Sequence, residues 1–391
     1  MALARPDQPL RAVDTPPSLA ETVAALAADF AGTAAEHDRS GAFPFANFDR
    51  LAEAGLLALI TPRRYGGQGG GLQDAALAVG GIARGEPSTA LVLSMQYLQH
   101  ASIEERGWPA HLAEKLGREA AAGVSVINAL RVEPELGSPA RGGLPATIAR
   151  RTPEGWRVSG HKIFSTGIPI LSWLAVWATT DEAEPRVGTI LVPAGTPGIR
   201  VVESWDQLGM RATNSHDVIL DDVLVPLDHA VDLRPPEAWR VPEPGKSAWS
   251  ALLIGALYDG VARSARDWFI GFLKSRVPAN LGAPLATLPR MQDAVGEIEA
   301  LLAVNARLIA GAARDVDDGR PPSPSESGLL KLAVTGNAIA AVEIAVKLTG
   351  NPGLSRANPL ERHYRDVLCA RIHTPQDDSV RLTAGRLALG L

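Results

Sequence analysis

The sequence predicts an α+β protein with an N-terminal helical domain, a middle antiparallel β-barrel or sandwich, and a C-terminal four-helix bundle. Two patterns predict this order. Apolar residues recur at helical spacing over residues 19–125 and again within 236–391, whereas short apolar runs bounded by Gly and Pro fill residues 126–235. Residues 1–18 show neither pattern, and we expect them to form a flexible tail.

Length and composition argue against several classes of protein. The 391 residues can hold two or three domains, and 46% hydrophobic with 21% charged residues is typical of a soluble globular protein. A net charge of −5 argues against general nucleic-acid binding. We find no long uninterrupted apolar run and no apolar core of a signal peptide, so we expect neither a membrane span nor a leader. The single Cys369 suits a reducing cytoplasm, and the eight His lack metal-ligand spacing, so we predict no metal site.

The N-terminal helical pattern has two possible caps and one clear break. Ser18 is placed to cap a first helix and Asn47 a second one. The Gly-rich run Tyr65–Gly71 then interrupts the pattern. Such a run can hold a phosphate, but no strand precedes it and no Gly-Lys-Ser/Thr ends it. We therefore favour a turn between helices.

The middle domain is predicted from strand-like runs between residues 155 and 226, which Gly and Pro turns separate. A continuous apolar run over 173–178 indicates a buried strand. Apolar and acidic residues alternate over 217–221, as in a strand with one buried face.

The C-terminal bundle is predicted from apolar stripes at helical spacing. Three of them lie within 249–272, 291–308 and 330–348. A fourth helix, over 365–389, is expected to be broken at Pro375. Four long antiparallel helices are typical of a bundle.

Three motifs of the β-domain resemble those of a known family. They are Gly-x-Lys-x-Phe-Ser-Thr-Gly at 160–167, Leu-Gly-Met-Arg at 208–211, and Asp-Val-x-x-Asp-Asp-Val-x-Val-Pro at 217–226. In this order and spacing they resemble the middle domain of the acyl-CoA dehydrogenase superfamily of flavoenzymes, and the resemblance covers nearly the whole chain. It implies the acyl-CoA dehydrogenase fold and a homotetramer or homodimer built on the helical bundle.

The resemblance implies a flavin and residues that hold its ring. Phe164 and Ser165 match the segment that lies against the isoalloxazine, and Thr166 matches the residue that hydrogen-bonds near N5. The alternative for these residues is a plain strand-ending turn.

A second ring contact is implied by residues 132–139, which are similar to the family's Thr-Glu-Pro-x-x-Gly-Ser-Asp. Ser138 matches its Ser, which contacts flavin or thioester substrate. Val132 replaces the Thr that bonds the ring, so we expect backbone groups of Leu130 and Val132 to serve instead.

Bundle residues match the family's contacts to the rest of the cofactor. Arg276 and Gln292 match the pair that grips the flavin pyrophosphate across a subunit interface, and a guanidinium suits a diphosphate. The other interpretation of Arg276 is a surface residue at a helix end. Gly350 and Gly353 match glycines near the adenine half of FAD. We therefore expect FAD, with FMN as the alternative.

The segment that follows Leu360 departs from the family's dehydrogenases. In those enzymes a Glu nine residues after the Arg of an Arg-Asp pair removes the α-proton of the acyl thioester. Here the Arg is Arg365, and the position holds Thr374. A hydroxyl cannot act as an unaided general base near neutral pH. Members that place the base on the first bundle helix give Ser250 here, which is again not acidic.

His373, Thr374 and Gln376 are our candidate catalytic residues. Their stretch, His-Thr-x-x-Asp, resembles the flavin-dependent monooxygenase branch of the superfamily, whose members use reduced flavin from a separate reductase. This predicts a monooxygenase that acts with reduced flavin and O2 on a small organic substrate. A polar residue at a helix break is the other interpretation of His373.

Met95, Gln96 and His100 lie on one predicted helix, with Gln96 and His100 one turn apart. The family's corresponding helix lines the substrate pocket, so the resemblance implies that role here. Core packing explains Met95 equally well.

Other functions stay open. One is an acyl-CoA dehydrogenase, or a related acyl-CoA flavoenzyme, with a non-standard base such as Asp377 or Asp259. Another is a flavin enzyme that cleaves a substituent instead of a Cα–H bond. A flavin-free helical scaffold is the last, and the Phe-Ser-Thr motif at 164–166 together with Arg276 argues against it.

Overall fold

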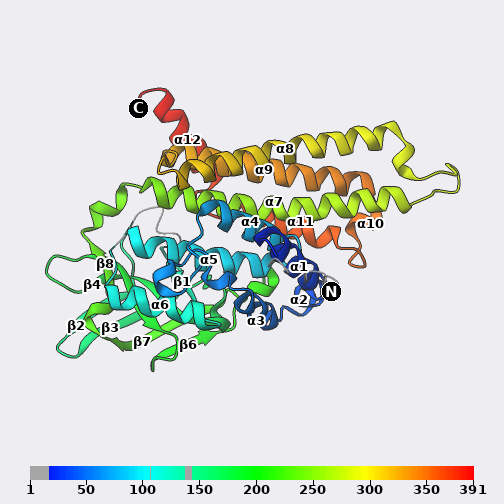
Figure 1. Cartoon of the computed structure of the whole chain (residues 1–391). Helices are drawn as coiled ribbons and strands as arrows, with labels where there is room; N and C mark the ends of the chain where they lie inside the picture. The colour runs from blue at the N-terminus through cyan, green and yellow to red at the C-terminus, as the bar shows by residue number, and fades with distance from the viewer. Residues whose placement is uncertain (1–16, 106, 137–142) are drawn as a thin grey trace, which may run out of the picture.

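The computed structural model describes residues 17–105, 107–136 and 143–391. Figure 1 shows one sheet, a group of N-terminal helices beside it, and long helices that extend away from both. Helix α5 contacts strand β1 of the sheet as well as α7 of the bundle, so the N-terminal helices join the other two parts. The predicted α+β class and its order of helices, strands and helices are confirmed.

The described residues of the N-terminal part form six α-helices. They are α1 (Leu19–Ala31), α2 (Ala34–Ser40), α3 (Phe45–Glu53), α4 (Leu72–Ala83), α5 (Pro87–Glu105) and α6 (Ala110–Ala122). The predicted cap at Ser18 is confirmed, because Ser18 and Glu21 form a reciprocal capping box. The predicted cap at Asn47 is wrong. Helix α3 begins at Phe45, and the buried Asn47 amide donates instead to Thr89 Oγ1 at 2.9 Å.

The middle part is one eight-stranded sheet. Its strands are β1 (Val126–Leu130), β2 (Ile148–Thr152), β3 (Gly155–Lys162), β4 (Leu171–Thr180), β5 (Val187–Pro193), β6 (Ile199–Val202), β7 (Asp217–Val225) and β8 (Ala230–Arg234). The order is β6-β7-β3-β2-β4-β5-β8, and β1 pairs with β4. The pairs β1–β4 and β2–β4 are parallel and the others antiparallel, so the predicted antiparallel sheet holds except around β4.

Helix α6 packs on the sheet through an apolar cluster. Leu112 and Leu116 of α6 meet Trp173 of β4 and Leu191 of β5 in this cluster. Strand β4 is almost wholly buried, whereas β7 keeps the predicted alternation of buried apolar and more exposed acidic residues.

The C-terminal part is built on three long helices, and two shorter ones share the fourth place of the bundle. The helices are α7 (Pro244–Ser275), α8 (Pro289–Asp317), α9 (Pro324–Thr349), α10 (Asn351–Leu354), α11 (Leu360–Leu368) and α12 (Asp377–Ala388). Helix α11 packs on α7 and α9, and α12 packs on α9. The predicted break at Pro375 falls between α11 and α12.

Helix α9 is long and apolar enough to cross a membrane, judged by length and composition alone, and no other described helix meets both criteria. It packs against α7, α8, α11 and α12. Its buried residues Ile339, Val342 and Ala345 belong to the main core of the fold. The apolar sequence of α9 is therefore accounted for by the interior of the bundle.

One joint connects all three parts of the chain. Arg365 of α11 makes a bidentate ion pair with Asp38 of α2, at 2.8 and 2.6 Å, and donates to the Leu208 carbonyl at 2.9 Å. The neighbouring Asp366 accepts from the Met210 backbone N–H at 2.7 Å. Burial raises the pKa of Asp366 to about 7, although this hydrogen bond opposes the shift.

The Leu208–Met210 loop packs directly on the backbone of α11. A Cβ added to Gly209 would collide with the Arg365 carbonyl oxygen and would lie 3.0 Å from the Asp366 Cα. Only glycine allows this approach.

We predict that Gly209→Ala lowers the free energy of unfolding by about 1–3 kcal/mol, because the added methyl group forces the loop away from α11. Urea denaturation measures this change. Gly271→Ala is the matched control, since nothing lies within 4 Å of a Cβ at that position of α7. It should leave stability unchanged or raise it slightly. Equal stability of Gly209→Ala and the wild type would contradict the prediction.

Candidate active site

The turn after β3 presents an aromatic side chain to solvent. Phe164 has φ 56°, in the left-handed region that an aromatic residue rarely adopts, and its side chain is 52% exposed. Its ring lies edge-on to Trp205, with centroids 6.3 Å apart. A strained, exposed aromatic residue at a strand end is typical of a surface for a flat ligand.

The two residues after Phe164 have hydrogen-bonding capacity that the described residues do not use. Ser215 Oγ donates to Thr166 Oγ1 at 3.0 Å, which leaves the Thr166 hydroxyl hydrogen for another acceptor. Asn128 donates to the Thr166 carbonyl at 2.9 Å and fixes its orientation. Ser165 is fully buried, and its Oγ has no partner among the described residues. Both hydroxyls suit a polar ring that docks on Phe164.

Leu130 and Val132 lie beside this turn. Leu130 ends β1 in the core, and the Val132 carbonyl accepts from the Ile163 N–H at 3.0 Å. Beneath them, the buried Lys162 Nζ lies 2.6 Å from Glu133 and donates to the Trp177 carbonyl. Burial lowers the pKa of Lys162 to about 8, although Glu133 opposes the shift. The pair connects the chain after β1, which carries Val132, to the end of β3, which Phe164 follows.

Ser138, the remaining predicted ring contact, lies outside the described residues. Its role stays a prediction.

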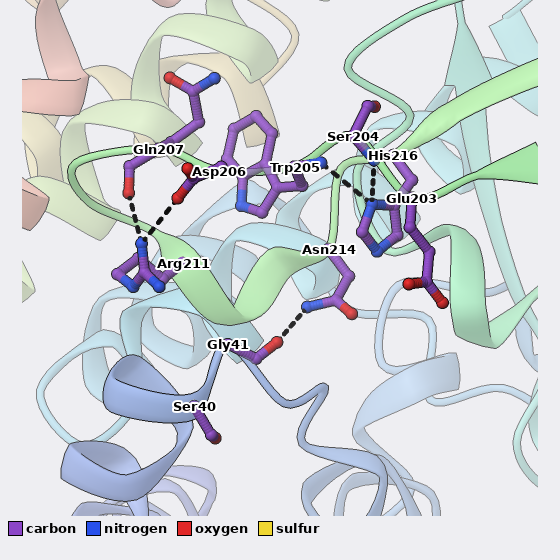
Figure 2. Close-up of a pocket in the computed structure, with 10 residues that line it drawn as sticks. All are labelled: Ser40, Gly41, Glu203, Ser204, Trp205, Asp206, Gln207, Arg211, Asn214 and His216. Carbon is purple, nitrogen blue, oxygen red and sulfur yellow. Dashed lines mark hydrogen bonds and ion pairs between the residues drawn. The ribbon is translucent and has the colours of Figure 1, made fainter.

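A polar pocket of ≈ 450 Å³ opens next to Trp205 (Figure 2). One wall is Ser40–Gly41 at the end of α2, which Asn214 holds through a 2.7 Å bond to the Gly41 carbonyl. The opposite wall is the 203–207 loop, whose N–H groups at Ser204 and Trp205 both donate to His216 Nδ1 at 3.1 Å. Burial lowers the pKa of His216, in keeping with this acceptor role.

The candidate catalytic residues His373, Thr374 and Gln376 lie on the non-helical chain between α11 and α12. The His373 ring packs 5.7 Å from the Tyr258 ring, centroid to centroid. Burial and the charge of Lys331 lower the pKa of His373 to about 4, so the imidazole is neutral at pH 7. Thr374 is exposed, and Gln376 is the N-cap residue of α12.

The carboxylates that could replace the missing base are already paired. Asp259 is buried in the bundle, where Arg263 Nε lies 2.6 Å from its Oδ2 and Asn305 donates to its Oδ1 at 3.0 Å. Asp377 Oδ1 lies 3.5 Å from the Nζ of Lys331. Either carboxylate would have to leave its partner before it could take a proton from carbon.

Within one chain, the residues predicted to hold the pyrophosphate and adenine parts of the cofactor lie far from Phe164. Arg276 is exposed at the end of α7, and Gln292 in the first turn of α8 donates to the Ala286 carbonyl at 3.0 Å. Gly350 and Gly353 lie at the junction of α9 and α10. Figure 1 shows that this end of the bundle points away from the sheet. One chain therefore does not bring the two groups together.

Met95, Gln96 and His100 lie on α5. Gln96 is fully buried and connects α5 to β1, because its Oε1 accepts from the Ile127 N–H at 2.7 Å. His100 is also buried and bonds Thr61 Oγ1 at 2.9 Å and Gln96 Nε2 at 3.0 Å. Burial lowers the pKa of His100 to about 4. These contacts have a structural role, and the predicted contact with substrate stays a prediction.

The structure also reveals functional candidates that the sequence did not indicate. Asn128 and Ser215 hold Thr166, and Lys331 contacts the 373–377 segment. The only sequence signal for Lys331 was its charge among the apolar residues of α9. A lysine usually faces solvent, so the sequence did not indicate a buried role. Among the described residues, no group of three or more His, Cys, Asp or Glu could hold a metal ion.

Three family models match the chain in order. They are the acyl-CoA dehydrogenase N-terminal domain over residues 16–123, the middle domain over 131–223 and the C-terminal domain over 247–386. Among curated proteins, YdbM of Bacillus subtilis, named as a candidate acyl-CoA dehydrogenase, is 35% identical over 92% of this chain and 93% of its own.

Two solved structures share the whole fold. The nitrososynthase of Micromonospora carbonacea is 26% identical, with a TM-score of 0.82 over 97% of this chain and 99% of its own. KijD3, solved with FMN and a dTDP-linked amino sugar, is 28% identical, with a TM-score of 0.82 over 97% of this chain and 95% of its own. The predicted flavin is thus present in a structural relative. The matched domains and the 35% identity to YdbM show that the chain belongs to the acyl-CoA dehydrogenase family.

Proposed function

We propose that this flavin oxidoreductase is a monooxygenase that uses reduced flavin and O2 on a small organic substrate. One observation carries the proposal. The position of the dehydrogenase base holds Thr374, and the nearest substitutes in sequence, Asp259 and Asp377, face Arg263 and Lys331. Abstraction of an α-proton needs a free base within hydrogen-bond reach, whereas oxygen transfer does not.

The structural relatives support the same chemistry. A nitrososynthase, as its name says, forms a nitroso group, which adds oxygen to nitrogen. KijD3 was solved with an amino sugar. We therefore propose amines and electron-rich heteroatoms as the first substrates to test.

The residues of the β3 turn fit a flavin. Phe164 offers an exposed aromatic face, and the unpartnered Ser165 hydroxyl and the Thr166 hydrogen offer polar contacts at its edge. A bound reduced flavin supplies the electrons for activation of O2. We propose FAD, with FMN delivered in reduced form by a separate reductase as the alternative.

Within this scheme the chain positions substrate and donates hydrogen bonds. Neutral His373 can donate or accept one hydrogen bond at each ring nitrogen, and Thr374 can donate one without removing a proton from carbon.

We also propose that a second copy of the chain completes the site. Arg276 is exposed, and no ion pair of its guanidinium occurs within the described part of this chain. Large apolar side chains are exposed near the C-terminus, including Ile372 and Leu382. Both observations favour a homotetramer or homodimer in which Arg276 and Gln292 reach the cofactor of a neighbouring copy.

An acyl-CoA dehydrogenase is the second candidate function. The 35% identity to YdbM along nearly the whole chain favours it. In this version Asp377 or Asp259 would have to leave its cation and act as the base.

We predict that the flavin-loaded protein, reduced and mixed with 18O2, transfers labelled oxygen to an amine or heteroatom substrate, because no free base competes for a Cα–H proton. Mass spectrometry of the product measures the incorporation. Anaerobic butyryl-CoA with the oxidised protein is the parallel assay and should leave the flavin spectrum unchanged. Bleaching of the flavin with formation of an α,β-unsaturated thioester would establish the dehydrogenase instead.

We predict that Phe164→Ala weakens flavin binding by about 10-fold or more, because it removes an aromatic contact worth about 1 kcal/mol beyond its buried area. Quenching of flavin fluorescence measures the affinity. Phe45→Ala is the matched control, since Phe45 is also 52% exposed but lies on α3. Equal affinities of the two variants would remove Phe164 from the site.

A further inference from the structure

We propose that Lys331 is a positioning residue that holds the 373–377 segment in the conformation that the active site requires. The inference rests on the proposed function, because it takes this segment as part of the catalytic site. Lys331 itself contacts no predicted cofactor or substrate group. Its role would be exerted through the backbone on both sides of Thr374.

The contacts of Lys331 all fall on one short stretch. Its Nζ donates to the His373 carbonyl at 2.9 Å and to the Pro375 carbonyl at 3.0 Å, and lies 3.5 Å from Asp377 Oδ1. The two carbonyls accept two of the three ammonium hydrogens, and the contact with Asp377 Oδ1 is an ion pair. Since the two carbonyls flank Thr374, the cation fixes the chain immediately before and after that residue.

Two backbone carbonyls of the segment lie outside regular secondary structure. Residues 372–376 are neither helix nor strand, so the His373 and Pro375 carbonyls have no partner in a regular ladder. Without Lys331 these oxygens would be left to water or unpaired. The stretch that carries the candidate catalytic side chains therefore depends on a side chain from another helix.

The surroundings of Lys331 fit this role. The residue is 1% exposed, although a lysine is almost never fully buried unless it is paired. One turn earlier, a Cβ on Gly328 would lie 3.2 Å from the Val380 side chain, so α12 approaches α9 closely at this point. Lys331 therefore binds the backbone of the segment, and Val380 packs the following helix, α12, against α9.

Other roles explain these observations less well. A surface ion pair would leave the lysine exposed. A lysine that acts on substrate would need an accessible Nζ, whereas Lys331 is 1% exposed and its Nζ donates to two backbone carbonyls. Burial lowers the pKa of Lys331. Asp377 opposes that shift and so favours the charged form that the contacts need.

The test compares Lys331→Met, Lys331→Arg and the wild type, all as full-length protein loaded with FMN. Lys331→Met keeps the volume and removes the cation. We expect faster amide hydrogen exchange in peptides that cover residues 371–378, and not elsewhere. We also expect kcat to fall about 10- to 100-fold with little change in KM, because the catalytic groups are misplaced but still present. Flavin affinity should be unchanged, and Lys331→Arg should recover part of kcat.

Lys347→Met is the matched control, because Lys347 lies on the same helix but is exposed. It should match the wild type in exchange and in kcat. Wild-type exchange and kcat in Lys331→Met would overturn the proposal, and so would a uniform rise in exchange across the chain. If Lys331→Met does not fold, Asp377→Asn replaces it, and unchanged exchange in 371–378 would then overturn the proposal.

The two proposals fail separately. Activity is measured in whichever assay the wild type supports, oxygen transfer from O2 or oxidation of butyryl-CoA. Wild-type turnover only with butyryl-CoA refutes the monooxygenase, and the exchange data on residues 371–378 still decide the role of Lys331.

Discussion

The contact between the Leu208–Met210 loop and helix α11 determines how the three parts of this chain fit together. Arg365 binds Asp38 of the N-terminal part and the Leu208 carbonyl of the middle part, while Asp366 accepts from Met210. A partly buried ion pair of this kind adds little net stability over an apolar contact, but a misaligned one is costly. The joint therefore selects one arrangement of the sheet, the N-terminal helices and the bundle.

The position of the candidate site follows from that arrangement. Helix α11 leads directly into the 373–377 segment, so fixing Arg365 and Asp366 on the sheet side also sets where that segment begins. A buried lysine lies in or next to each candidate functional stretch. Lys162 comes two residues before Phe164 and pairs with Glu133. Lys331 donates to the carbonyl of His373, the residue before Thr374. Lys331 satisfies backbone carbonyls of irregular chain, whereas Lys162 bonds Glu133 and a carbonyl of strand β4.

Much of the fold could be predicted because local patterns decide it. The Ser18 cap, the alternation in β7 and the break at Pro375 all depend on residues close in sequence. The sequence could not predict contacts between residues that lie far apart along the chain. Asn47 resembles a cap, but its amide bonds Thr89 on another helix. Gln96 and His100 form a polar helix face in sequence, yet their partners on other elements bury them. Lys331 could not be recognised, because its partners lie about forty residues further along the chain.

The proposed function depends on the residue at position 374. We proposed a monooxygenase because a carboxylate at this position would act as the base of a dehydrogenase, whereas the Thr374 hydroxyl is not a base near neutral pH. The most direct measurement is a crystal structure of the flavin-loaded protein with a bound substrate or thioester analogue. Our account predicts that Thr374 and His373 approach the ligand and that no Asp or Glu oxygen does. An Asp or Glu oxygen within about 3 Å of a ligand carbon that lies against the flavin ring would contradict it.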